Sequence, residues 1–348
     1  MNTQYRIVAL PGEGIGLEVV NATLTILQRV ARKHNFKLQV DYGVIGQPAF
    51  KQYGSYFPQA TSILCSKGDS ILFGAVSKGG LLELRKQFDF FVNLRPVKTF
   101  PSLLDKSSLK SDRLLGVDIL FVRELVSGIY FGASARETDA KGSYGYHTMQ
   151  YYDWQIKRIA KVALKKARER KGLLTVAHKE NALPCLPWTK LVREVAVEYP
   201  DVTVEPMLVD NLAMQLVINP QRFDTILAGN LFGDILSDLG GALVGSIGLL
   251  GSASLNSDGF GLYEPIHGTA PDIAGKNTAN PLGTLASAMI MLQQWGEIAA
   301  VNSLQQAWDN ILECGYRTAD LYSQETEILV NTQELVELFE RELSNMSY

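Results

Sequence analysis

Residues 5–16 read YRIVALPGEGIG and place a short apolar, partly β-branched run directly before a glycine-rich turn. The run Tyr5–Leu10 is typical of a buried strand, and Leu17–Lys33 after the turn repeats apolar side chains at helical spacing. Serine, glycine and aspartate then separate two further strand patterns, Leu38–Tyr42 and Ser70–Gly74. This alternation of strands and helices predicts an α/β protein with a largely parallel sheet.

The rest of the chain continues the alternation. Further strands are expected at Gly116–Arg123, Gly128–Gly132, Ser143–Met149, Leu173–Ala177, Val202–Leu208 and Thr225–Ala228. Further helices are expected at Trp154–Arg170, Trp188–Tyr199, Asn211–Ile218, Thr284–Trp295 and Thr332–Leu343. The 348 residues are enough for two domains, yet no low-complexity linker separates them. We therefore expect a chain that crosses between two domains more than once.

The composition excludes several classes of protein. The 33 basic and 36 acidic side chains give a net charge of −3, so no basic excess exists to neutralise a nucleic-acid backbone. The three cysteines, Cys65, Cys185 and Cys314, are far apart and form no Cys-x-x-Cys pair, which argues against a disulfide framework or a zinc site. We expect a cytoplasmic protein that does not bind nucleic acid.

No targeting or membrane segment is predicted. The N-terminal residues lack the charged-then-apolar layout of a signal peptide. Residues 239–257 carry no charge, but glycine and serine interrupt them, and a spanning helix needs about 20 predominantly apolar residues. We expect this segment to pack inside the protein, away from any membrane.

The glycine-rich turn resembles a dinucleotide-binding loop only in part. A strand precedes it, a helix follows it, and Asp41 lies further along, as in a Rossmann fingerprint. However, Pro11 interrupts the approach, and the third glycine, Gly16, arrives one residue early. The turn therefore indicates either a close approach of the backbone to another kind of ligand or an ordinary turn.

Asp234 and Asp238 form the strongest candidate metal site. Their spacing of four residues places both carboxylates on one helical face, where like charges repel. No other charged residue lies between Ile226 and Ser257, so a bound Mg²⁺ or Mn²⁺ would relieve the repulsion. Asp210, at the end of an expected strand, is a candidate third ligand. A solvated helix face or a helix cap is the alternative interpretation.

The segment Glu264–Asp272, EPIHGTAPD, has little helical periodicity and predicts a loop of the kind that often carries function. His267 can stack on a planar ligand. Asp272 can accept hydrogen bonds from a ribose diol, which is the chemistry expected for NAD rather than NADP. The alternative is a loop with a purely structural role.

Three arginines lie in apolar surroundings and match the geometry of carboxylates. They are Arg85, Arg95 and Arg123, and a di-acid substrate would suit them. The alternative is ion pairing within the protein, with partners such as Glu83, Asp89 or Glu124.

Tyr130 and Lys179 are candidate acid–base groups. Each could act in proton transfer if burial or neighbouring cations lowered its pKa. A structural role is the alternative for both.

Seven segments of the chain, taken in order, resemble the metal-dependent β-decarboxylating dehydrogenases of the isocitrate/isopropylmalate family. The segments read LPGEGIG, LLELRK with NLRP, VRELVSGIYFG, HKENAL, VDNLAMQL, NLFGDILSD and EPIHGTAPDIAGKNTANP. The resemblance implies an isopropylmalate-dehydrogenase-like two-domain α/β fold that is not a Rossmann fold.

The same resemblance implies a discontinuous first domain. Residues 1–97 and 249–348 would form a cofactor-side domain, and residues 98–248 a central domain that carries the dimerisation elements. It also implies a homodimer in which each active site lies between the domains and is completed by the second subunit.

The resemblance assigns a role to each candidate side chain. Asp234 and Asp238, joined by Asp210 from the partner subunit, are the implied ligands of Mg²⁺ or Mn²⁺. Tyr130 and Lys179, the lysine again from the partner, are the implied catalytic residues. The residues implied to contact the substrate are Arg85, Arg95, Arg123, Leu81, Leu82 and Lys78. Those implied to bind NAD are Ile15, Asn181, Glu264, His267, Gly268, Thr269, Ala270, Asp272 and Asn280.

The implied reaction is the oxidation of a 2-hydroxy di-acid, with hydride passing from C2 to NAD, followed by loss of CO₂ from C3. Lys78 stands where isopropylmalate enzymes usually carry a glutamate, and Ala75–Gly80 is shorter than usual, whereas Leu81 and Leu82 are retained. We therefore expect 3-isopropylmalate, or a close analogue with a larger apolar C3 substituent such as benzyl, as the substrate.

Other readings of the chain make different predictions. Homoisocitrate, isocitrate or tartrate would be the substrate if the apolar leucines did not contact the C3 substituent. A non-catalytic subunit of the same fold is disfavoured because the aspartates, Tyr130 and Lys179 are all present. A metal-free Rossmann dehydrogenase would keep its activity in the presence of a chelator.

Overall fold

The N-terminal strand lies deep in the protein. In the computed structural model, which describes residues 3–346, strand β1 (Gln4–Gly12) is buried from Ile7 to Pro11. It pairs in parallel on both sides, with β2 (Lys37–Tyr42) and with β3 (Ser70–Ala75). Helix α1 (Gly16–Lys33) follows the turn. The predicted opening of strand, turn and helix is confirmed.

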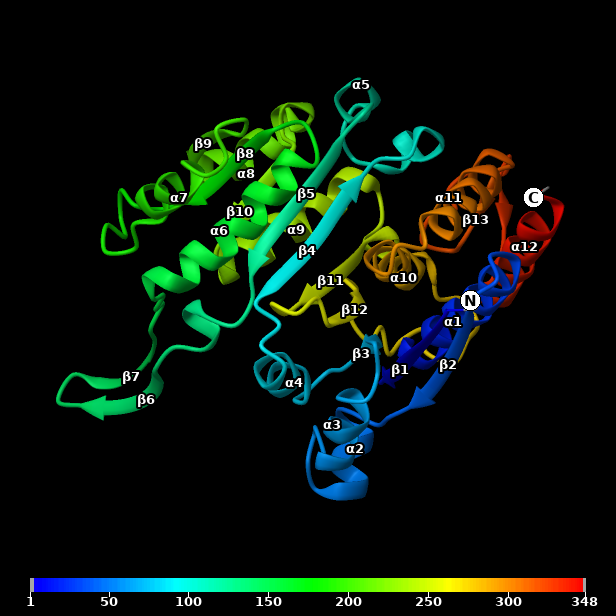
Figure 1. Cartoon of the computed structure of the whole chain (residues 1–348), viewed down its shortest axis with the longest axis horizontal. Coiled ribbons are helices and arrows are strands. Elements are labelled where there is room, and N and C mark those ends of the chain that lie inside the picture. Colours follow the sequence, from blue (N-terminus) through cyan, green and yellow to red (C-terminus); the bar gives the residue numbers. More distant parts are fainter. Residues whose placement is uncertain (1–2, 347–348) are drawn as a thin grey trace.

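These strands belong to a ten-stranded sheet that runs through the molecule (Figure 1). The other strands are β4 (Val92–Lys98), β5 (Asp118–Glu124), β8 (Leu173–His178), β9 (Thr203–Leu208), β10 (Thr225–Ala228), β11 (Gly251–Leu255) and β12 (Gly261–Pro265). Their order across the sheet is β2–β1–β3–β12–β11–β4–β5–β10–β8–β9. As expected, the order is not that of a Rossmann fold, because β12 and β11, which come late in the sequence, lie between β3 and β4.

The sheet is parallel towards both edges and antiparallel at its centre. The pairs β1 with β2, β1 with β3, β3 with β12, β5 with β10, β10 with β8 and β8 with β9 are parallel. The pairs β12 with β11, β11 with β4 and β4 with β5 are antiparallel. The prediction of a largely parallel sheet in an α/β protein is confirmed, and the antiparallel centre is the part that local patterns did not predict.

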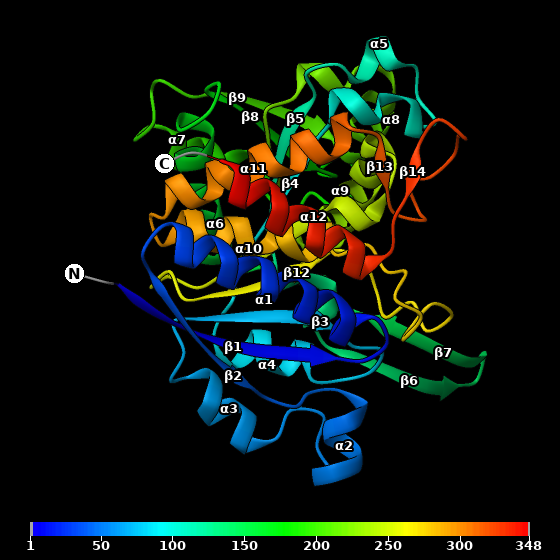
Figure 2. The same ribbon diagram turned by 90° about the vertical axis from the view of Figure 1, so that its right-hand side faces the viewer.

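Helices cover both faces of the sheet. The remaining longer helices are α2 (Gln47–Tyr53), α3 (Gln59–Cys65), α4 (Leu81–Gln87), α6 (Asp153–Arg168), α7 (Trp188–Ala196), α8 (Val209–Ile218), α9 (Asn230–Val244), α10 (Leu282–Gln294), α11 (Ile298–Glu313) and α12 (Thr332–Asn345). Short turns of helix are α5 (Ser111–Leu114), η1 (Pro101–Lys106), η2 (Gly128–Tyr130), η3 (Pro220–Arg222) and η4 (Ile247–Leu249). Figure 2 shows α1, α10, α11 and α12 on one side of β1–β3 and α2 and α3 on the other.

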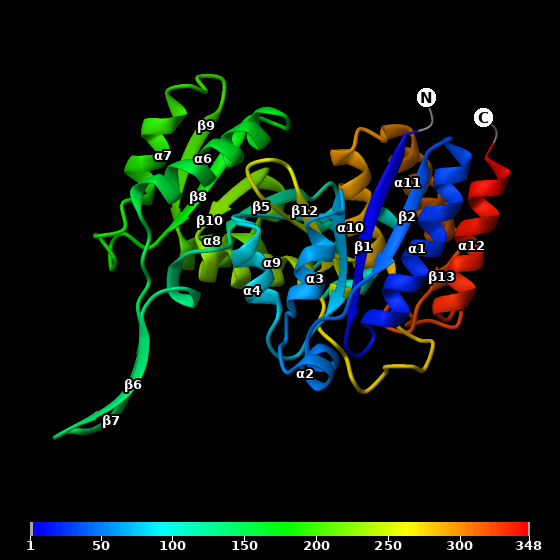
Figure 3. The same cartoon turned by 60° about the horizontal axis from the view of Figure 1, so that its bottom comes forward.

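Two small sheets lie outside the main one. Strands β13 (Tyr316–Arg317) and β14 (Ile328–Leu329) pair in parallel, whereas β6 (Ser134–Asp139) and β7 (Gly142–His147) form an antiparallel hairpin. Every residue of β7 is exposed, and the hairpin projects away from the rest of the fold (Figure 3). The predicted strand at Ser143–Met149 therefore exists, but it belongs to this arm and not to the main sheet.

The predicted strand at Gly128–Gly132 is wrong, because residues 128–130 form the helical turn η2. Gly128 has a φ of +76°, and a Cβ atom there would lie 2.3 Å from the hydroxyl oxygen of Tyr151. The conformation and the close neighbour both require glycine, so the chain turns at this point.

The uncharged segment 239–257 folds inside the protein. It forms the end of α9, then η4, then β11. A Cβ atom on Gly251 would lie 2.4 Å from the backbone nitrogen of Ser287 on α10, which explains why small residues occupy β11. Among residues 3–346, no helix has the length and apolar character needed to span a membrane.

Candidate active site

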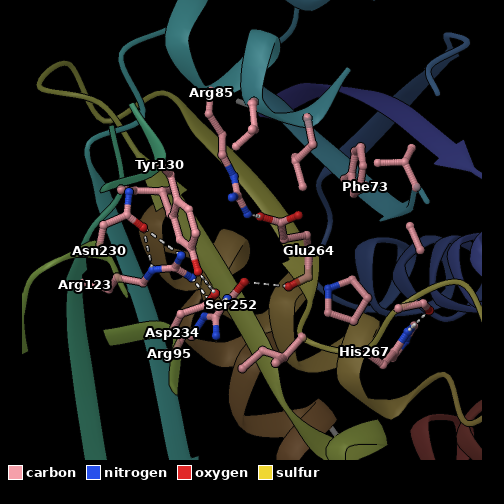
Figure 4. Close-up of a pocket in the computed structure, with 18 of the residues that line it drawn as sticks. Phe73, Arg85, Arg95, Arg123, Tyr130, Asn230, Asp234, Ser252, Glu264 and His267 are labelled. Carbon is pink, nitrogen blue, oxygen red and sulfur yellow. Dashed lines mark hydrogen bonds and ion pairs between the residues drawn. The ribbon is translucent and has the colours of Figure 1, made fainter. Parts of the chain in front are cut away.

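A cavity of about 340 Å³ lies beside the centre of the sheet (Figure 4). Its walls come from the end of β3, from α4, β4, β5, η2, α9 and β11, and from β12 with the residues after it. The predicted site residues in its lining are Leu81, Leu82, Arg85, Arg95, Arg123, Tyr130, Asp234, Glu264, His267 and Gly268. The fold therefore brings together side chains that are far apart in the sequence.

Two buried arginines hold the two aspartates of α9. Arg123 Nη1 lies 2.5 Å from Asp234 Oδ1, and Arg95 Nη2 lies 3.4 Å from the same oxygen. Arg95 Nη1 also lies 3.0 Å from Asp238 Oδ1. The two guanidinium groups thus balance the two carboxylates that would otherwise repel each other.

The third arginine pairs with a different acid. Arg85 Nη2 lies 2.6 Å from Glu264 Oε1, and both side chains are buried. Glu83 instead caps α4, and Asp89 pairs with Arg158. The three arginines therefore line one cavity, as a shared substrate site would require. They also form ion pairs within the protein, but their partners are Glu264 and the two aspartates of α9, and not Glu83 or Asp89.

Tyr130 faces the same cluster. Its hydroxyl oxygen lies 3.3 Å from Asp234 Oδ2. Burial, followed by the negative charge of Asp234, raises the pKa of Tyr130. The pKa of Tyr130 is therefore raised and not lowered, so the phenol keeps its proton at neutral pH and is suited to donate a proton but not to accept one.

The aspartates of α9 are candidate ligands for a hard cation. Asp238 is exposed, and partial desolvation still raises its pKa, with Asp234 adding to this effect and Arg95 opposing it. Such carboxylates suit Mg²⁺ or Mn²⁺. Within residues 3–346 no group of three histidine, cysteine, aspartate or glutamate side chains is placed to hold an ion. The donor set fits a cation, but one copy of the chain does not supply a third protein ligand.

Asp210 and Lys179 lie together outside the cavity. Lys179 Nζ lies 2.6 Å from Asp210 Oδ1, an ion pair between the loop after β8 and the start of α8. The ion pair lowers the pKa of Asp210. Lys179 borders a small, mainly apolar recess next to Trp188 and Phe232. Asn181 is exposed in the same loop. The structure thus separates these three predicted residues from the other members of the site.

The glycine-rich turn approaches another loop of the chain. The backbone N–H of Ile15 donates to the carbonyl oxygen of Thr269 over 2.9 Å. A Cβ atom on Gly14 would lie 1.9 Å from that oxygen. The turn therefore approaches the chain's own loop, and the predicted approach of its backbone to a ligand stays a prediction. The side chain of Ile15 is buried against Ala279, so any contact of Ile15 with NAD stays a prediction.

The loop after β12 offers groups that fit a dinucleotide. His267 Nδ1 lies 3.0 Å from the carbonyl oxygen of Gly268, and Nε2 is buried with no hydrogen-bond partner among the described residues. Burial lowers the pKa of His267, so its ring is neutral and able to stack. Asp272 is exposed, Ala270 has a φ of +37°, and Asn280 is buried and donates to Asp320 over 3.1 Å.

One predicted substrate contact does not reach the cavity. Lys78 is exposed and does not line it, whereas Leu81 and Leu82 from α4 do. Phe73, Val76 and Leu125 extend this apolar wall. Asn230 and Ser252 also line the cavity, and the sequence analysis did not select them. Asn230 stands at the start of the NLFGDILSD motif, which was the available signal.

The chain is similar to known proteins over most of its length. The isocitrate/isopropylmalate dehydrogenase family matches residues 6–339. The 3-isopropylmalate dehydrogenase of Synechocystis sp. is 43% identical over 346 residues, covering 94% of this chain and 96% of that protein. The protein of the same name from Zymomonas mobilis is 45% identical over 333 residues, covering 91% and 95%.

Solved structures show the same architecture. Isocitrate dehydrogenase from Methylococcus capsulatus superposes with a TM-score of 0.88 at 29% identity, covering 97% of this chain and 99% of that one. The TT0538 protein from Thermus thermophilus superposes with a TM-score of 0.87 at 30% identity, covering 98% and 68%. The fold and the predicted resemblance are therefore confirmed together.

Proposed function

The chain belongs to the isocitrate/isopropylmalate dehydrogenase family, and we propose on this basis that it catalyses the NAD-dependent oxidative decarboxylation of a 3-substituted malate. The single observation that carries the proposal is the convergence of Arg95, Arg123, Tyr130 and Asp234 on one cavity. With Arg85, the cavity has three arginines in its lining, and three cationic side chains suit a di-acid.

The substrate is 3-isopropylmalate or a close analogue. The relatives from Synechocystis sp. and Zymomonas mobilis are 3-isopropylmalate dehydrogenases, and the arginines provide cations for the two carboxylates. Leu81 and Leu82 supply an apolar wall that suits an uncharged C3 substituent and disfavours the additional carboxylate of isocitrate. Since Lys78 does not line the cavity, a larger substituent such as benzyl fits the same proposal.

Two side chains carry the proton steps. Lys179 of the partner subunit removes the proton of the C2 hydroxyl as hydride leaves C2. Cleavage of the bond between C3 and its carboxylate then releases CO₂, and the electron pair remains on C3. Tyr130 donates a proton to C3, for which its raised pKa is suited, because the phenol is protonated when the step begins.

Asp234 and Asp238, with Asp210 of the partner subunit, would hold Mg²⁺ or Mn²⁺. When bound, the cation supplies a Lewis acid to the C2 oxygen and neutralises the charge that develops there. Arg95 and Arg123 hold these aspartates in place, and Asp234 lines the cavity.

The loop after β12 would hold NAD. We place the cofactor contacts at Ile15, Asn181, Glu264, His267, Gly268, Thr269, Ala270, Asp272 and Asn280. When bound, NAD accepts the hydride. The unpartnered Nε2 of His267 and the exposed carboxylate of Asp272 support this placement.

We propose a homodimer with shared active sites. The exposed fractions of Met214 on α8 and Ile235 on α9 are 50% and 60%, and these helices are neighbours. Large apolar side chains of this kind mark a surface for a partner. The same α9 carries Asp234 and Asp238, so a partner that covered this helix would reach the site.

We also retain the predicted domain division, with residues 1–97 and 249–348 in one domain and 98–248 in the other. The sheet order supports it, because β2, β1, β3, β12 and β11 are consecutive at one side and β5, β10, β8 and β9 at the other. A cytoplasmic location remains part of the proposal and is supported by the three free cysteines.

The test is NADH formation by the purified protein over a panel of 2-hydroxy di-acids, with Mn²⁺ or with a chelator. The panel contains 3-isopropylmalate, 3-benzylmalate, isocitrate, homoisocitrate and tartrate. We expect the highest kcat/KM with an apolar 3-substituted malate and no activity with the chelator. A best rate with isocitrate or tartrate, or activity that survives the chelator, would overturn the proposal.

A further inference from the structure

We infer that Asn230 is a positioning residue: its buried side-chain amide fixes the orientation of Arg123 relative to the turn that carries Tyr130. The inference rests on the proposed function and deepens it, because it names a residue without an assigned role. Asn230 is the first residue of α9, and its exposed fraction is 1%. Figure 4 shows it beside Arg123, with dashed lines from its amide to the guanidinium.

The amide oxygen fixes the plane of the Arg123 guanidinium. Asn230 Oδ1 accepts hydrogen bonds from Arg123 Nε over 3.2 Å and from Nη2 over 2.8 Å. Asn230 thus holds one edge of the guanidinium, and the remaining nitrogen, Nη1, donates to Asp234, which lines the cavity. Because a guanidinium is planar, holding two of its nitrogens determines the direction of the third.

The amide nitrogen anchors the turn that carries Tyr130. Asn230 Nδ2 donates to the carbonyl oxygen of Ser127 over 2.9 Å, directly before the turn Gly128–Tyr130. The backbone N–H of Asn230 also donates to Tyr151 Oη over 2.8 Å. That hydroxyl lies against Gly128 and Gly229, so the start of α9 and the turn share one packed contact.

Only an amide meets both requirements at once. It accepts hydrogen bonds from a cation with one atom and donates to a carbonyl with the other, while remaining neutral. An aspartate in its place could accept from Arg123 but could not donate to Ser127, and it would neutralise a cation that the substrate needs. An alanine would leave Arg123 Nε and Nη2 and the carbonyl oxygen of Ser127 without this partner in a buried site, which is costly.

The first test uses the protein without substrate. In wild-type protein labelled with ¹⁵N-arginine, we expect the Arg123 Nε–H signal, assigned with Arg123→Lys, to exchange slowly with solvent. In Asn230→Ala we expect fast exchange of this signal and faster deuterium uptake by the backbone amides of Gly128 and Phe131. Unchanged protection of either group would overturn the inference, whatever the substrate proves to be.

The second test separates positioning from general support of the fold. We expect Asn230→Ala to raise KM for the best substrate and to lower kcat, each by about ten-fold. Since the KM effect acts through Arg123, it should disappear when Arg123→Lys is already present. Equal losses in both backgrounds, or changes below about two-fold, would overturn the inference.

Two controls keep these outcomes interpretable. Asn331→Asp changes a helix-capping asparagine far along the chain at α12 and should leave KM, kcat and amide exchange unchanged. Thermal unfolding of each variant reports whether it is folded. If wild-type protein oxidised no member of the panel, the proposed function would fail, and the exchange measurements would still decide the role of Asn230.

Discussion

Lys179 Nζ and Asp210 Oδ1 form a 2.6 Å ion pair that lies outside the cavity containing Tyr130 and Asp234. Both residues take part in the proposed reaction, but in one copy of the chain they do not line this cavity. A second copy that delivered them as a pair would complete the site. The ion pair would hold the lysine and the metal ligand in a fixed relation before the two chains meet.

The shared site predicts complementation between inactive variants. Tyr130→Phe and Lys179→Ala homodimers should each be nearly inactive. A mixed dimer contains one site with both native residues, so mixing and refolding equal amounts should restore about one quarter of wild-type activity. The measurement is NADH formation after exchange of subunits. Mixing without subunit exchange is the control, and no recovery in true heterodimers would contradict the shared site.

The aspartates of α9 predict that a single substitution weakens cation binding. Asp238→Asn removes one oxygen ligand and leaves Arg95 without that partner. We expect the Mn²⁺ concentration for half-maximal activity to rise at least about a hundred-fold. The stabilisation of the protein by Mn²⁺ in thermal unfolding should fall in parallel. Asp258→Asn, on an exposed turn, is the matched control and should behave as wild type.

Asp272 predicts the preference for NAD over NADP. Asp272→Arg removes the acceptor for the ribose diol and offers a cation to a 2′-phosphate. Because Asp272 is exposed, the fold should tolerate the change. We expect the ratio of kcat/KM for NAD to that for NADP to fall by at least about ten-fold. Asp258→Arg makes the same charge change elsewhere, and an equal shift in that variant would refute the assignment.

The apolar wall predicts a change in substrate preference. Leu82 lines the cavity and its exposed fraction is 47%, so Leu82→Ala should widen the pocket at little cost in stability. We expect the kcat/KM ratio of 3-benzylmalate to 3-isopropylmalate to rise about ten-fold. Leu115→Ala, at an exposed leucine outside the cavity, should leave this ratio unchanged. A fall in the ratio for Leu82→Ala would show that the substituent lies elsewhere.

Glu124 predicts how stability depends on pH. The carboxyl is fully buried, accepts hydrogen bonds from the backbone N–H groups of Val126 and Ser127, and has its pKa raised by burial from 4.5 to about 7. Between these values the folded state binds more protons than the unfolded state. The unfolding free energy should therefore fall as pH rises through this range and level off above it.

Glu124→Gln should remove this dependence. Relative to the variant, wild type should lose about 1.4 kcal/mol of unfolding free energy for each pH unit between the two pKa values. Urea unfolding at several pH values measures the difference. Glu325→Gln, at an exposed position, is the control. A difference between wild type and Glu124→Gln that did not vary with pH would show that the buried carboxyl is already ionised.

Much of the fold was predictable because its signals are local. The apolar run of β1, the turn after it and the helical spacing of α1 all lie within 30 residues, and the structure has them where the pattern predicts. The four-residue spacing of Asp234 and Asp238 placed both carboxylates on one face of α9, and both contact Arg95. Periodicity of this kind is set by the geometry of a single element.

The composition of β11 illustrates where local signals end. Its residues, GSASL, carry no strand pattern, and four of the five are fully or nearly fully buried. They are small because α10 packs directly against them, a constraint that only the neighbouring helix imposes. A strand covered on both faces shows no alternation of polar and apolar residues, so the sequence analysis described this segment only as packed.

The sequence by itself determined the opening strand, turn and helix and the shared helical face of Asp234 and Asp238, because each follows from the geometry of one local segment. Only the tertiary structure decided that β11 and β12 enter the sheet between β3 and β4. That insertion joins Arg85 to Glu264 across 179 residues, and the central sheet with α9 joins Arg95 to Asp238 across 143. Such pairings depend on mutual packing of buried surfaces whose local patterns are alike, so no short stretch of sequence specifies them.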